Sequence, residues 1–197
     1  MKKSSFMIVA ALGLILPRLA QAEETWVVDS MHSGVGFAVR HMMISNVSGF
    51  FSKFSGKVTT NAKDVTRSVV EAEVEVGSIT TQVPARDKHL LSPDFFDVAK
   101  YPKMTFKSTK IQKASKGKLK IIGDLTIRDK TQKVTFDAVG PTKAIKDMQG
   151  KMRIGLQAST TIDRRKFGLT WNKALKAGGV AVDTKVALHL TLELVKQ

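Results

Sequence analysis

The stretch Val186-Ala187-Leu188-His189-Leu190-Thr191-Leu192-Glu193-Leu194 carries an apolar side chain at every second position. In an extended strand, successive side chains point to opposite faces of the sheet. The five apolar residues of this stretch therefore share one face, and His189, Thr191 and Glu193 lie on the other. Such alternation predicts a β-strand with one face buried and one face in water.

The same period of two recurs along most of the chain. The alternation is found in residues 34–41, 70–76, 119–125, 134–138 and 152–162. Further candidate strands are residues 26–29, 50–60 and 104–111. With residues 186–194, the chain has about nine candidate strands. Turn residues such as Lys116-Gly117 and Gly140-Pro141 separate these runs. Many short strands without βα alternation predict an all-β antiparallel sandwich or barrel.

Two segments interrupt the strand pattern. Residues 83–96 place Pro84 before a run of good helix formers and end at Ser92-Pro93, which predicts a short helix. Residues 164–179 contain scattered apolar positions and two adjacent glycines, which predicts a loop with one helical turn.

Alternation does not distinguish a sandwich from a closed barrel. A closed sheet of about eight strands can hold a small ligand in its interior, whereas a sandwich fills the same space with side chains. The aromatic and methionine residues on the strand faces suit both uses. From composition alone, a filled core is the commoner outcome.

The first residues have the three parts of a secretory signal peptide. Lys2 and Lys3 precede the apolar run 6–16, and Ala20-Gln21-Ala22 supplies small residues before a cleavage point at Glu23. A retained anchor or a buried helix is the alternative. We therefore expect cleavage, export and a periplasmic location.

The domain organisation follows from this division. Residues 1–22 form the signal peptide, and residues 23–197 have a length typical of one domain. The chain contains no cysteine, so the exported domain must derive its stability from its core and not from disulfides.

The chain is strongly basic, with a formal net charge of +15. Removal of residues 1–22 would leave 29 basic against 17 acidic residues, or +12. This charge suits either a solvated surface or contact with anionic membrane and acidic partners. The lysines are scattered and no nucleic-acid-binding motif accompanies them, so we expect no nucleic acid partner.

Few residues suggest chemistry. The four histidines lack metal-ligand spacing, and neither a Gly-x-Ser-x-Gly motif nor a cysteine nucleophile occurs. We therefore expect no enzymatic activity, no metal and no cofactor. The alternative is a periplasmic enzyme acting on a lipid or small apolar substrate, for which His41 with Asp163 or Arg164 is the first combination to test.

Several short motifs, in order and at consistent spacing, resemble the YceI-like family over nearly all of residues 23–197. The motifs are residues 26–33, 35–42, 47–51, 78–81, 86–96, 106–109, 123–127, 162–164, 167–168 and 171–172. Each motif is weak singly, and the most informative is Arg86-Asp87-Lys88-His89-Leu90-Leu91-Ser92-Pro93-Asp94-Phe95-Phe96. This tract either caps one barrel end or forms a lid, with an ion pair between Arg86 and Asp87 and a plug formed by Phe95 and Phe96.

The resemblance implies an extended antiparallel lipocalin-like β-barrel of about eight strands with one or two short helices. It also implies a long apolar pore that binds an isoprenoid lipid, either a polyprenyl chain or a quinone tail, for carriage or sequestration. An anionic membrane surface and a second copy of the chain are further candidate partners.

The strand faces supply the candidate lipid-binding residues, which are Phe37, Val39, His41, Phe106, Ile121, Leu125, Phe136, Ile154, Leu156, Leu188 and Leu190. His41 shares a strand face with Phe37 and Val39. It is expected either to donate a hydrogen bond to a lipid headgroup or to be a hydrogen-bonded core residue.

Overall fold

The computed structural model describes residues 23–61 and 63–197; the expected signal peptide lies outside this range. The strands are β1 (Glu23–Val28), β2 (Gly34–His41), β3 (Ser45–Phe51), β4 (Phe54–Asn61), β5 (Val69–Glu75), β6 (Ile79–Thr80), β7 (Lys103–Ser115), β8 (Lys118–Ile127), β9 (Lys130–Val139), β10 (Ile145–Lys146), β11 (Met152–Asp163) and β12 (Val182–Lys196). One α-helix, α1 (Pro84–Leu91), and 3₁₀ turns at Val65–Arg67, Val76–Ser78 and Arg164–Phe167 complete the described part. None of these helical segments is long and apolar enough to cross a bilayer.

The sheet closes on itself. Antiparallel pairing runs in the order β11–β9–β8–β7–β5–β4–β1–β12, and β12 pairs again with β11 from Arg153–Val195 to Asp163–Lys185. The result is a closed antiparallel barrel of eight strands with one helix. This confirms the predicted fold class and excludes the sandwich.

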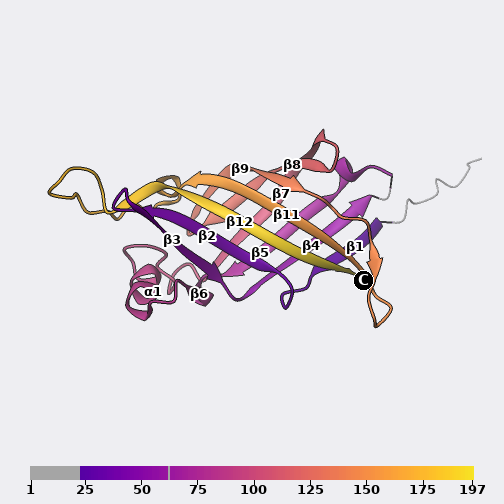
Figure 1. Cartoon of the computed structure of the whole chain (residues 1–197), viewed down its shortest axis with the longest axis horizontal. Coiled ribbons are helices and arrows are strands. Elements are labelled where there is room, and N and C mark those ends of the chain that lie inside the picture. The colour runs from indigo at the N-terminus through magenta and orange to yellow at the C-terminus, as the bar shows by residue number, and fades with distance from the viewer. Residues whose placement is uncertain (1–22, 62) are drawn as a thin grey trace, which may run out of the picture.

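Three neighbouring wall strands are each made of two segments. β1 and β2 both lie along β12, through the pairs Val28–Leu194 and Gly34–Thr191, with residues 29–33 bulging between them. β3 and β4 follow β2 and β1 in the same way, and β5 and β6 follow β4 and β3. The breaks lie at the same level of the barrel, and the paired segments lengthen it (Figure 1).

The expected single strand over residues 50–60 is therefore wrong, because Ser52 and Lys53 separate β3 from β4. Ser52 N donates to Ser78 O at 3.2 Å, and Lys53 N donates to Ser78 Oγ at 3.0 Å. Since β-bulges and bends re-aim a strand without changing its apolar alternation, the sequence pattern alone did not reveal this break.

The tract 83–96 forms α1 and caps one end of the barrel. Pro84 occupies the first turn of α1, and Ser92 Oγ donates to His89 O at 2.8 Å after its last residue. Phe95 is buried, with its ring 5.2 Å from that of Trp171. The predicted Arg86–Asp87 ion pair is not formed, because both side chains bind Thr81 instead.

The opposite end of the barrel is held by Arg153. Its Nη1 donates to Asp29 Oδ2 and Glu193 Oε1, and its Nε donates to Asp147 Oδ2, each at 2.6 Å. The hydrogen bonds from Arg153 hold the pKa of Asp29 well below its usual value, lower the pKa of Asp147 and raise the pKa of Arg153. One half-buried guanidinium thus joins the β1–β2 bulge, the β10–β11 turn and β12.

We predict that Arg153→Met flattens the acid dependence of stability. Because the folded pKa values of Asp29 and Asp147 are depressed, their contribution is present above the unfolded pKa of about 3.9 and is lost as the pH falls towards the folded values. Urea midpoints measured from about pH 5 downwards should fall more steeply for the wild type. Lys118→Met, at an exposed lysine of β8 that pairs with no described carboxylate, is the control; an equal flattening in that variant would contradict the assignment.

Candidate functional site

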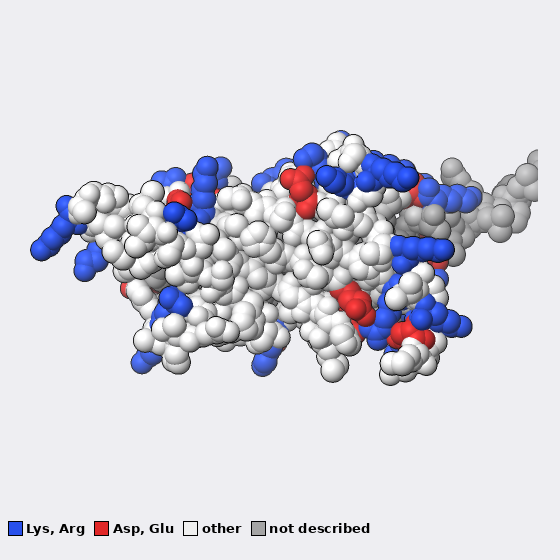
Figure 2. All heavy atoms as spheres, in the orientation of Figure 1, with Lys and Arg blue, Asp and Glu red and all other residues white. Residues whose placement is uncertain are grey.

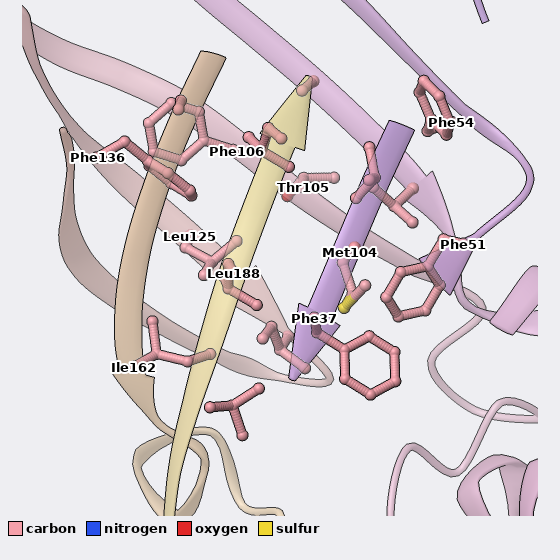
Figure 3. A pocket seen from close by; sticks show the side chains of 18 of the residues that line it. Phe37, Phe51, Phe54, Met104, Thr105, Phe106, Leu125, Phe136, Ile162 and Leu188 are labelled. Atoms are coloured by element: carbon pink, nitrogen blue, oxygen red, sulfur yellow. The ribbon is translucent and has the colours of Figure 1, made fainter. Parts of the chain in front are cut away.

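An elongated cavity of about 230 Å³ lies inside the barrel. Inward-facing side chains of nearly every wall strand line it, and Figure 3 shows Phe37, Phe106, Phe136 and Leu188 around the same space. The predicted alternation explains this wall, because every second residue of a barrel strand faces the interior. The barrel is therefore hollow and not filled by its own side chains.

The cavity is long and narrow. β12 contributes lining residues from Val182 to Leu192, ten positions apart, which corresponds to about 33 Å of strand. A volume of 230 Å³ spread over such a length leaves a thin channel. This shape suits an extended chain better than a compact ring system.

The wall is almost wholly apolar. Among its residues only Ser55, Thr105 and Arg164 have polar side chains. Arg164 is buried, and its guanidinium donates to the backbone oxygens of Leu169, Trp171, Val182 and Asp183 at 2.6 to 3.2 Å. Burial lowers the pKa of Arg164, and its bonds join the loop after the 3₁₀ turn to the start of β12.

Two aromatic rings lie flat against the sheet because a glycine faces them. Phe37 pairs directly with Gly49 across β2 and β3, and a Cβ at Gly49 would overlap the Phe37 ring. Likewise, a Cβ at Gly123 would lie 2.5 Å from Cζ of Phe106. A larger residue at either glycine would push the ring towards the centre, so these glycines keep the barrel hollow.

Nine of the eleven candidate lipid-binding residues lie on the cavity wall. They are Phe37, Val39, Phe106, Ile121, Leu125, Phe136, Leu156, Leu188 and Leu190. Their contact with a lipid stays a prediction.

Ile154 and His41 are not part of the wall. Ile154 precedes Leu156 by two residues on the same face of β11 and pairs with the buried Leu194. His41 is the last residue of β2, where the chain turns back into β3. Alternation assigns a residue to a face of its strand, but it does not show where along the strand the hollow ends.

Other wall residues were not among the candidates. Leu90, Phe95 and Phe96 come from α1 and the segment after it, and close the cavity at that end. A two-residue period cannot detect them, because they do not belong to a strand. The suggested plug formed by Phe95 and Phe96 was the only sequence signal for them.

Asp29, His32 and Glu193 offer ligand atoms within 4.8 Å of one another, as a metal site would. Arg153, however, lies 2.6 Å from both carboxylates. The positive charge that a metal ion would supply is already provided by this guanidinium, and we assign the cluster to stability.

We predict that Gly49→Ala shrinks the cavity. The new methyl group would overlap Phe37 and lie 2.9 Å from Thr80 O, so the ring must move inwards and the free energy of unfolding should fall by about 1–3 kcal/mol. A crystal structure and chemical denaturation test both effects.

Gly36→Ala is the matched control, because a Cβ at Gly36 meets nothing closer than 3.6 Å. If Gly49→Ala matched this control in stability and in cavity volume, the spacing role of Gly49 would be wrong.

Comparison with known proteins gives a consistent family. The YceI-like domain matches residues 26–194. A UPF0312 protein of Staphylococcus epidermidis is 34% identical over 165 residues, covering 84% of this chain and 94% of that protein. A UPF0312 protein of Vibrio parahaemolyticus is 36% identical over 173 residues, covering 86% and 89%.

Solved structures share the fold. BcnA of Burkholderia cenocepacia has a TM-score of 0.72 at 22% identity, with 84% of this chain and 98% of that chain covered. The YceI protein of Campylobacter jejuni has a TM-score of 0.69 at 28% identity, covering 80% and 90%. A polyisoprenoid binding domain from Saccharophagus degradans has a TM-score of 0.63 at 13% identity, covering 87% and 98%.

Proposed function

This chain belongs to the YceI-like family, and we propose that its barrel binds an isoprenoid lipid, either a polyprenyl chain or a quinone tail. The observation that carries this proposal is the thin apolar cavity, lined along about 33 Å of β12. The similarity in fold to a polyisoprenoid binding domain supports the same class of ligand.

Binding of this kind needs burial and little else. Each methylene removed from water contributes about 0.8 kcal/mol, so a chain of about forty carbons would gain roughly 30 kcal/mol. Measured affinities do not exceed about 20 kcal/mol. Lost chain freedom and incomplete burial must offset the difference, and we infer that the protein selects chain length by how much of the tail the channel encloses.

We propose that the protein binds its lipid without transforming it. His41 is outside the cavity wall, and Asp163 accepts hydrogen bonds from the backbone and side chain of Arg165. Arg164 uses its donors on backbone oxygens. An enzyme acting in the same cavity would need polar groups that converge on the substrate, whereas Asp163 and Arg164 are engaged in local hydrogen bonds.

The signal-peptide-like sequence of residues 1–22 supports a cellular location for this binding. We propose that residues 23–197 are exported to the periplasm and carry or sequester the lipid there. Contact with an anionic membrane surface and pairing with a second copy of the chain are further parts of this proposal.

We predict that Ala158→Trp abolishes lipid loading. Ala158 lies on β11, is buried and faces the cavity, so an indole there would occupy the channel. Native mass spectrometry of the purified protein, followed by solvent extraction, should detect a co-purifying apolar molecule in the wild type and none in the variant.

Ser159→Trp is the matched control, because Ser159 is the next residue of β11 and is exposed. It should load as the wild type does. Repeated purification of wild-type protein without any apolar molecule would contradict the proposed function.

A further inference from the structure

The turn between β2 and β3 exposes three consecutive large apolar side chains. Met42 is 42% exposed, Met43 is 55% exposed and Ile44 is 74% exposed. Single exposed apolar residues are common on protein surfaces. Three adjacent ones at the end of the barrel form a patch of the kind that marks a contact with another apolar phase.

The backbone of this turn is unfavourable for the residues that form it. Met42 and Met43 have φ values of 50° and 65°, and Ile44 N donates to His41 O at 3.1 Å. Two central residues with positive φ define a type I′ turn, for which Asn-Gly is strongly preferred. Because methionine has a Cβ that disfavours this region, folding alone does not explain the Met-Met pair.

A second loop supports the turn. Met42 N donates to Ala181 O at 2.8 Å, and the side chain of Met43 lies beside Gly179. Residues 172–182 are folded back on themselves by the bridge between Ala174 and Val180. We call residues 40–46 and 172–182 together the apolar tip, which lies at the far left of Figure 1.

The charged residues within the apolar tip are all positive, and Asp183 directly follows its second segment. Its two segments contain Arg40, Lys173 and Lys176, all exposed, and no aspartate or glutamate. Within residues 23–61 and 63–197, none of these three forms an ion pair. Figure 2 shows basic side chains around uncharged atoms at this end. Apolar side chains encircled by cations complement an anionic lipid surface.

The apolar tip adjoins the cavity. His41 pairs with Val182, and both Val182 and Val39 line the cavity. The channel therefore reaches to within three residues of Met42 along β2. A lipid held at this end of the channel lies close to whatever surface the tip contacts.

We propose that the apolar tip docks on an anionic membrane, with Met42, Met43 and Ile44 inserted among the lipids and Arg40, Lys173 and Lys176 against their phosphates. The barrel then stands with one end of its channel at the bilayer. Docking itself is argued independently of the proposed function. Its role, which is loading or delivery of the bound lipid at the membrane, rests on that function.

Co-sedimentation with vesicles tests the docking. Vesicles of phosphatidylcholine with phosphatidylglycerol, containing no isoprenoid, should bind the wild type, and added salt should weaken the binding. Ile44→Asp should lower the partition coefficient about ten-fold, because the inserted apolar surface is lost. Met148→Asp, at a still more exposed apolar residue between β10 and β11, should bind as the wild type does.

A double variant separates docking from folding. Met42→Asn with Met43→Gly installs the preferred type I′ pair, so the melting temperature should rise while vesicle binding falls. A variant that is more stable and still binds as the wild type does would overturn the proposal, as would equal losses in Ile44→Asp and Met148→Asp.

Native mass spectrometry keeps the two proposals apart. The Ile44→Asp protein should still carry lipid acquired during expression, because Ile44 is not part of the cavity wall. Wild-type protein that binds vesicles but never carries lipid would refute the proposed function and leave the docking site in place. Lipid-loaded wild-type protein that fails to bind anionic vesicles would refute the docking site and the proposed membrane contact, and would leave lipid binding in place.

Discussion

Hydrogen bonding between β11 and β12 is the interaction on which the rest of the structure depends. It runs from Arg153–Val195 to Asp163–Lys185 and joins the last strand to the far side of the sheet. Without it, the sheet would have two long free edges and its apolar face would be open to water. Closure turns a curved sheet into a tube, and the tube gives the alternating apolar residues an interior to face.

A closed tube of eight strands need not be hollow, since side chains alone can fill one of this size. Here the aromatic residues are large but their partners are small. Gly49 under Phe37 and Gly123 under Phe106 allow the rings to lie along the wall. The cavity thus depends on small residues at specific cross-strand positions. The apolar composition of the wall does not distinguish it from an ordinary core.

The sequence predicted the features that depend on local pattern. The alternation along the wall strands identified the inward faces and nine wall residues, three of them on β11 and β12. It did not predict the break at Ser52, which depends on hydrogen bonds to Ser78. It also did not predict that Ile154 and His41 lie outside the cavity wall, because alternation does not show where along a strand the hollow ends. The choice between sandwich and barrel also required the β11–β12 pairing, a long-range contact, and only the family resemblance anticipated it.

The aligned breaks in three neighbouring wall strands divide the barrel into two unlike sides. β7, β8, β9, β11 and β12 are strands of 10 to 15 residues, whereas the other side consists of segments of two to eight residues that meet at a common joint. At this joint β12 changes its partner from β1 to β2, and the sheet beyond it ends at β6, which among the described strands pairs only with β3. Leu90, Phe95 and Phe96 therefore supply cavity wall at the end where strand pairing stops.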